Sequence, residues 1–164
     1  MRKMIGILLL VVMMFGMTSC SSEAMNNDDV KTFVKEYKTE QYTIENPDDP
    51  LTGLEIGEKV KPFLSEEELE NLMKNRVFSI APTIAKNIGK SVELEGVRLE
   101  KEQENDNGSI DYTYTLKLKY YDDHSSVVVA KKGELTIKNN DGLKITRDWE
   151  KPTEFEQYAI LQSH

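Results

Sequence analysis

Residues 110–121 alternate between apolar or aromatic and polar side chains, and no other pattern in the sequence constrains the fold as strongly. One set of alternate positions holds Ile110, Tyr112, Tyr114, Leu116, Leu118 and Tyr120. Successive side chains of a β-strand point to opposite faces of its sheet, so this pattern predicts a strand with one buried face. A sheet with a single apolar face needs a second layer to cover it.

Three more segments with this two-residue period surround that strand, and turn-forming residues separate them. The alternating segments are 92–99, 125–138 and 143–149. The turn-forming segments are 105–108, 122–124 and 139–142. Tight turns join antiparallel neighbours, so we expect a four-stranded antiparallel meander.

The parity of the apolar residues predicts which side chains share the covered face. Gly96 lies between Val92 and Leu94 on one parity and Val97 and Leu99 on the other, which indicates a β-bulge. In the last two strands the apolar parity holds Val127, Val129, Leu135, Ile137, Leu143, Ile145, Arg147 and Trp149. The opposite face then carries a small basic strip formed by Lys117, Lys119, Lys131 and Lys132.

The first half of the chain has a helical period. An apolar stripe at i, i+3, i+4 and i+7 predicts a first helix, capped by Asn27 or Asp28 and ending near Tyr42. A second segment spans 53–64, where Pro62 limits the helix. Ser65 and Glu68 have the spacing of a capping box, and they begin a segment that runs to Arg76.

One more buried face follows over residues 77–88, kinked or restarted at Pro82 and stopped at Gly89. The sequence thus predicts an α+β fold, with N-terminal helices packed on a curved, four-stranded antiparallel sheet. We expect the α+β domain to span 28–150, with a C-terminal extension over 151–164.

The first nineteen residues have the order of a secretory signal peptide. Arg2 and Lys3 give a basic start, and an apolar run over 5–17 follows, too short to span a bilayer. Ser19 and Cys20 then resemble a bacterial lipobox, with Met17 where leucine is usual. The alternative is an ordinary secreted protein with an unpaired cysteine near the cleavage site.

The lipobox resemblance implies a lipoprotein of the Gram-positive type, anchored to the outer face of the bacterial cytoplasmic membrane. Residues 1–19 would be removed, Cys20 would carry the lipid, and residues 20–27 would form the tether. The remaining chain has 19 basic against 29 acidic side chains, which disfavours nucleic acid as a partner. Cys20 is the only cysteine, so no internal disulfide forms.

Helices followed by a long meander, together with the stretch 60–69 (VKPFLSEEEL), are similar to the nuclear-transport-factor-2-like (cystatin-like) superfamily. The resemblance implies a cone in which the bent sheet wraps around a helix and leaves a pocket at the wide end. It also implies homodimers through the outer face of the sheet. The superfamily contains isomerases, dehydratases and non-catalytic binding modules, so fold alone does not decide function.

Four residues are candidates for ligand binding in such a pocket. Tyr112 and Tyr114 share the apolar parity of the clearest strand, and Arg147 and Trp149 share that of the last. The alternative is that the tyrosines are core or rim aromatics and that Arg147 extends along a sheet edge. Asp111 and Asp148 fall on the polar parity, so we expect both to be exposed.

The sequence predicts no catalytic residue, no cofactor and no metal site. His124 falls in a turn and His164 at the end of the chain, so no nucleophile–base pair can be assigned. The loops at 106–108 and 141–142 lack the ligand spacing of a calcium loop, and no phosphate-binding glycine motif is present.

We therefore favour a non-enzymatic binding module of the cell envelope, with a protein partner or an apolar small ligand. The alternative is a small-molecule isomerase or dehydratase that uses the cone pocket. An enzyme requires a buried acid or base that faces Tyr112 or Tyr114 across a cavity. A module requires a filled interior and an exposed apolar patch or strand edge.

Overall fold

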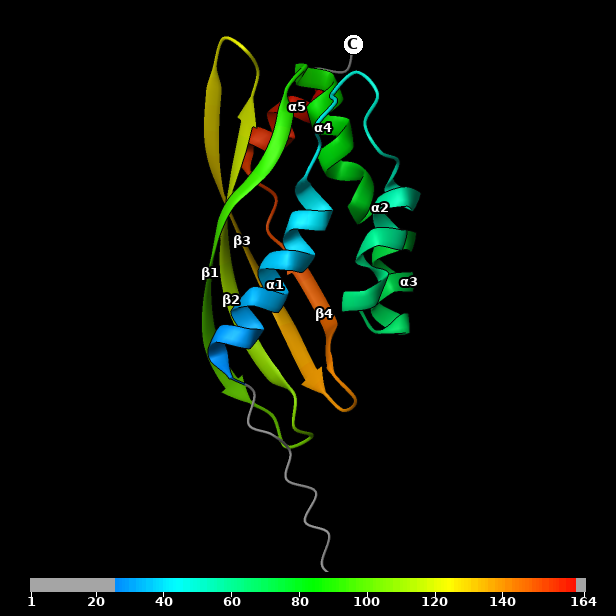
Figure 1. Cartoon of the computed structure of the whole chain (residues 1–164), viewed down its shortest axis with the longest axis vertical. Helices are drawn as coiled ribbons and strands as arrows, with labels where there is room; N and C mark the ends of the chain where they lie inside the picture. Colours follow the sequence, from blue (N-terminus) through cyan, green and yellow to red (C-terminus); the bar gives the residue numbers. More distant parts are fainter. Residues whose placement is uncertain (1–25, 162–164) are drawn as a thin grey trace, which may run out of the picture.

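The computed structural model describes residues 26–161, so the predicted signal peptide, Cys20 and His164 lie outside the described residues. Four α-helices precede a four-stranded sheet, and a fifth follows it (Figure 1). The helices are α1 (Asn27–Tyr42), α2 (Gly53–Val60), α3 (Glu66–Lys74), α4 (Ile80–Ile88) and α5 (Glu154–Leu161), with short 3₁₀ turns at Lys61–Phe63 and Val77–Ser79. The strands are β1 (Ser91–Glu104), β2 (Ile110–Tyr121), β3 (Ser126–Asn139) and β4 (Leu143–Glu150).

The sheet has the order β1-β2-β3-β4, and every neighbouring pair is antiparallel. It is long and curved, and helices α1 to α4 lie along one face (Figure 1). The predicted α+β class, with N-terminal helices on a curved antiparallel sheet, is confirmed. Within residues 26–161, no helix combines the length and the apolar character needed to cross a bilayer.

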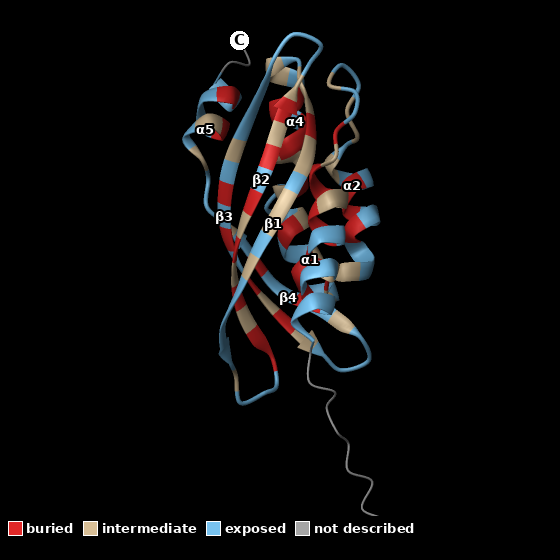
Figure 2. Cartoon of the chain, turned by 60° about the vertical axis from the view of Figure 1, so that its left-hand side comes forward, coloured by how far each residue is buried: buried red, intermediate tan, exposed pale blue. Residues whose placement is uncertain are grey.

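Strand β2 has the predicted alternation. Its six even-numbered residues, Ile110 to Tyr120, are all buried, whereas the odd-numbered positions are half-buried or exposed (Figure 2). The bulge at Gly96 is also confirmed, since the β1–β2 register shifts between Leu94 and Gly96. A second shift between Lys101 and Gln103 was not predicted.

The helices cover the sheet with their apolar stripes. Val30, Val34 and Tyr37 of α1 are fully buried, as predicted from their spacing. They belong to one continuous core with the inner residues of the sheet. The apolar side chains of the helices and of the sheet thus pack directly against one another.

Several predicted helix boundaries were wrong. Asn26 caps α1, in place of Asn27 or Asp28. α3 ends at Lys74, because Arg76 adopts a left-handed conformation with φ 57°. α4 begins at Ile80, so Pro82 lies in its first turn, where a missing N–H costs little, and it neither kinks nor restarts the helix. Gly89, at φ 64°, ends α4 as predicted.

Only half of the predicted capping box at Ser65 is formed. The Ser65 side chain accepts from the Glu68 N–H, but the Ser65 N–H donates to the Ile145 carbonyl of β4. Glu68 is therefore free to contact the sheet. A complete capping box occurs instead between Thr52 and Glu55 at the start of α2.

Candidate functional site

A bulge in β4 decides which predicted residues point inward. The register with β3 shifts between Ile145 and Arg147, so Thr146 is an extra residue on β4. Ile145 and Asp148 are buried, whereas Arg147 and Trp149 are exposed. The predictions that Arg147 and Trp149 share the covered face and that Asp148 is exposed were therefore wrong, because a bulge inverts the parity beyond it.

Asp148 lies at the centre of a buried polar cluster on the inner face. Its Oδ2 atom lies 2.6 Å from the Nζ atom of Lys38 and accepts from the Tyr37 hydroxyl at 2.7 Å. Its Oδ1 atom accepts from the Tyr114 hydroxyl at 2.7 Å. Its backbone N–H donates to Glu68 Oε1 at 2.8 Å. The carboxylate thus has direct partners on both oxygens.

Glu150 is the second buried carboxylate of the cluster. Its Oε1 atom lies 2.6 Å from Lys38 Nζ and 3.3 Å from the Tyr114 hydroxyl. Its Oε2 atom accepts from the Tyr42 hydroxyl and lies 3.5 Å from Lys131 Nζ. Lys38 therefore bridges the two carboxylates, and its ammonium also lies 4.8 Å from the Tyr114 ring centroid.

Lys131 extends the cluster to α5. The prediction that it lies on the outer basic strip was wrong, because its side chain is buried on the inner parity of β3. Its Nζ atom lies 2.7 and 2.8 Å from the two carboxylate oxygens of Glu156. Glu156 also accepts from the Thr153 N–H at 2.9 Å, which caps α5 locally, and its pair with Lys131 anchors the first turn of α5 on β3.

Burial and the two carboxylates hold the cluster tyrosines neutral. Burial raises the pKa of Tyr37, Tyr42 and Tyr114 well above the usual value; the charge of Glu150 raises it further for all three, and that of Asp148 does so for Tyr37 and Tyr114. A neutral phenol at these positions donates a hydrogen bond and does not act as a base at physiological pH.

The charged groups are held in their ionised forms. Burial alone lowers the pKa of Lys38, but Asp148 and Glu150 outweigh it, and the pKa is raised. Burial alone raises the pKa of Glu150, but Lys38 and Lys131 outweigh it, and the pKa is lowered. Glu68 differs, since burial raises the pKa of its carboxyl. Direct pairing of this kind keeps Lys38 and Glu150 charged inside the protein.

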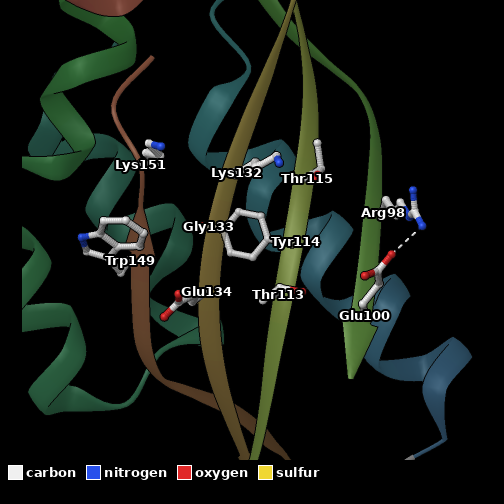
Figure 3. Close-up of a pocket in the computed structure, with 10 residues that line it drawn as sticks. All are labelled: Arg98, Glu100, Thr113, Tyr114, Thr115, Lys132, Gly133, Glu134, Trp149 and Lys151. Atoms are coloured by element: carbon white, nitrogen blue, oxygen red, sulfur yellow. Dashed lines mark ion pairs between the residues drawn. The ribbon is translucent and has the colours of Figure 1, made fainter. Parts of the chain in front are cut away.

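Two cavities on the outer face of the sheet are each lined by two of the four predicted ligand-binding residues. A cavity of about 510 Å³ is lined by Tyr114 and Trp149 (Figure 3), and one of about 220 Å³ by Tyr112 and Arg147, although both tyrosines belong to the inner parity of β2. Gly133 leaves room for the Tyr114 ring, whose hydroxyl reaches Asp148, because a Cβ at Gly133 would press on that ring and lie 2.6 Å from the Trp149 carbonyl oxygen. Charged side chains of both signs surround this cavity, among them the 2.6 Å Arg98–Glu100 ion pair.

Two tyrosines on the inner face lack hydrogen-bond partners. The buried hydroxyls of Tyr112 and Tyr120 contact no donor or acceptor among residues 26–161. Burial raises the pKa of both phenols. Tyr112 therefore takes no part in the cluster around Asp148.

A more apolar cleft of about 370 Å³ lies beside the cluster, between α3, α4, α5 and the end of β4. Leu72, Val77, Ile80 and Pro152 contribute apolar wall, and the exposed Trp149 forms part of its rim. Asp148 and Glu150 also reach its lining, although their oxygens are engaged in the cluster.

The sequence contains one partial indication of this cluster, which is the spacing of Lys38 in α1. Lys38 continues the i, i+4 row of Val30 and Val34, so its place on the buried stripe of α1 is visible in the spacing. Asp148, Glu150 and Glu68 gave no such signal. The bulge hides the parity of the first two, and Glu68 fitted a local capping role.

Comparison with known proteins identifies relatives by fold only. No family model matches the sequence, and no curated protein matches it. Three solved structures are similar over about four fifths of this chain and nearly all of their own length.

An IcmL-like type IV secretion system protein from Legionella pneumophila has a TM-score of 0.57 at 12% identity, over 80% of this chain and 96% of its own. A periplasmic fragment of TraM has a TM-score of 0.54 at 13% identity, over 79% of this chain and 100% of its own. TraH, a putative transfer protein of the Gram-positive conjugative plasmid pIP501, has a TM-score of 0.53 at 16% identity, over 80% of this chain and 98% of its own. At these identities the comparisons establish a shared fold.

Proposed function

We propose that this chain is a lipid-anchored, extracytoplasmic interaction module of a bacterial envelope assembly of the conjugation or type IV secretion kind. One observation carries the proposal. Tyr114, Asp148 and Lys38 contact one another directly and do not face each other across a cavity. The acid and base groups of the inner face thus stabilise a filled core, and the surface is left for function.

The fold supports the choice of assembly. The similar structures include proteins described as a type IV secretion protein, a periplasmic TraM fragment and a conjugative transfer protein. The TraM fragment is described as periplasmic, which agrees with the secretory signal predicted for this chain. Membership of the nuclear-transport-factor-2-like superfamily and a Gram-positive origin remain predictions.

The proposed anchor is a thioether-linked lipid on Cys20, which lies outside the described residues. Two or more acyl chains hold a protein stably on a membrane without a spanning helix. The test is fractionation of host cells that express the full chain. Cys20→Ala should leave the membrane fraction, whereas Ser21→Ala should stay there with the wild type. Retention of Cys20→Ala would contradict the anchor.

The proposed partner is a protein, and cross-linking in host membranes tests this. We expect the intact chain to cross-link to other envelope proteins of a DNA-transfer or secretion system, identified by mass spectrometry. Recovery of the chain without any cross-linked protein would contradict the proposal. The homodimer through the outer face remains a prediction, and a self-cross-link between β2 strands would support it.

The apolar cleft favours one second function, the binding of a small apolar ligand. Its volume of about 370 Å³ falls in the range of small-molecule sites. The four predicted ligand-binding residues form a separate proposal, since Tyr112, Tyr114, Arg147 and Trp149 line the outer cavities. Native mass spectrometry of protein purified from its host tests both. If Ile80→Trp loses a bound molecule, that molecule occupies the cleft. If Trp149→Ala loses it and Ile80→Trp does not, it occupies the outer cavity. If the purified protein carries no bound molecule, both proposals are contradicted.

A further inference from the structure

The N-terminal part of β3, from Ser126 to Ala130, forms a strand edge that has no neighbour among the described residues on the β4 side. β3 pairs with β2 from Ser126 onward, but its pairing with β4 begins only at Gly133. Beyond β4, the chain makes one more backbone hydrogen bond to β3, from the Lys151 N–H to the Lys132 carbonyl at 2.9 Å, and then turns into α5. The edge from Ser126 to Ala130 therefore has no neighbouring strand among residues 26–161.

The parity of β3 identifies the free backbone groups. Because the Lys132 carbonyl faces the β4 side, the N–H and C=O groups of Val128 and Ala130, and of Ser126, face the same side. No described residue pairs with them. The side chains there are accessible as well, with Val127 39% and Val128 49% exposed, although α5 lies beside this part of the strand (Figure 2). Val127 has the inner parity that the sequence predicted, opposite the buried Tyr120, but it is not covered.

The open part of β3 is less protected than the edge strand β1 on the other side of the sheet. β1 carries Arg98, Glu100, Lys101, Glu102 and Glu104 and two register shifts, the usual devices that block strand addition. The open part of β3 has no charge, no proline and no register shift between Ser126 and Ala130. Its three consecutive valines favour an extended partner.

Charges at the two ends of the open edge specify the charge pattern of an antiparallel partner. The exposed Lys132 and Lys151 lie at one end, and the exposed Asp123 of the β2–β3 turn lies at the other, beside Asp122, which is paired with Lys90. An antiparallel strand brings its N-terminal end to the lysines and its C-terminal end to the aspartates. The complementary segment is acidic, then β-branched and apolar, then basic.

We propose that the edge of β3 from Ser126 to Ala130 binds an extended segment of a partner protein as an added antiparallel strand, with acidic residues at its N-terminal end. This inference rests on the proposed function, because it names the surface through which the module would bind its partner. Main-chain hydrogen bonds supply recognition in this mode, and the flanking charges supply direction.

The test uses the full chain in detergent micelles and a fluorescein-labelled synthetic peptide, DEVTVTVK, followed by fluorescence anisotropy up to about 1 mM, since interfaces this small are weak. Ala130→Pro removes an outward N–H without touching the β2 ladder, and it should weaken binding by about tenfold or more. Val128→Thr keeps the backbone and should stay within about twofold. The charge-exchanged peptide KKVTVTVE should bind more weakly than DEVTVTVK.

A modified peptide keeps the test valid if Ala130→Pro fails to fold. N-methylation of alternate peptide amides leaves the protein unchanged, and methylation in one of the two alternating sets should abolish binding. The proposal is overturned by no binding at the highest concentration, or by binding that neither change weakens. It is also overturned if the chain forms dimers that Ala130→Pro dissociates, since the occupant is then a second copy. If Ala130→Pro loses peptide binding but still forms the envelope cross-links of the wild type, this edge is not the surface that binds the partner. The proposed function would then stand, and the inference about β3 would be refuted.

Discussion

Replacing Lys38 with methionine should destabilise the fold more than any surface substitution. The Lys38 side chain is fully buried between the carboxylates of Asp148 and Glu150, each 2.6 Å from its ammonium. Methionine keeps much of the volume and removes the cation, so two buried carboxylates lose their shared partner. Breaking a buried ion pair from one side costs about 3–5 kcal/mol.

That loss is a large part of the total stability of a domain, which is about 5–15 kcal/mol. For a domain of this size it corresponds to a fall in Tm of roughly 10–20 °C. Urea unfolding, followed by the fluorescence of the single tryptophan, Trp149, and by circular dichroism, measures the change. The loss should shrink at acid pH, because protonation removes the uncompensated negative charge.

Two matched variants separate the buried charge from the loss of any lysine. Lys59 lies 3.8 Å from Glu40 with both side chains about half exposed, so Lys59→Met should cost no more than about 1 kcal/mol. Lys38→Met combined with Asp148→Asn removes one orphaned charge and should recover part of the loss. If Lys38→Met costs as little as Lys59→Met, the cluster does not stabilise the fold as we argue.

Three further predictions concern backbone packing, acid stability and helix capping. Gly133→Ala should lower the free energy of unfolding by about 1–3 kcal/mol, because its Cβ would meet an aromatic ring and the β4 backbone, whereas Gly96→Ala has open space and should change it far less. The pKa of Glu150 is lower in the folded state, so its contribution is present above the unfolded pKa and should be lost as the pH falls through the folded value; urea unfolding between pH 7 and pH 3 measures this, and an unchanged midpoint would contradict it. Thr52→Ala should cost about 1 kcal/mol by removing the capping box of α2, and an unchanged Tm in a thermal melt would contradict it.

The sheet was predictable because its strongest signal is local. The alternation of β2 and the turn residues on either side predict two antiparallel connections, β1–β2 and β2–β3, with no knowledge of tertiary structure. The glycine at position 96 likewise marked its own bulge. The strand, the turns and the bulge were each predicted correctly, because each depends on only a few neighbouring residues of the chain.

The polar interior was not predictable in the same way, because it depends on contacts between distant segments. The bulge at Thr146 has no glycine to mark it, and it exchanges the faces of Arg147 and Asp148. Lys131 follows an alternating strand pattern in which a lysine normally indicates solvent, yet Glu156 of α5 neutralises it within the core. Sequence periodicity describes which positions face inward, but it does not reveal which charges find partners there.

The proposed function is tested most directly in the native host. DNA transfer or protein secretion should be measured in a strain that lacks this chain, and then in the same strain complemented with the wild type or with Cys20→Ala. Our account predicts that activity falls without the chain, returns with the wild type and does not return with the unanchored variant. Transfer and secretion that both continue unchanged in the deletion strain would contradict it.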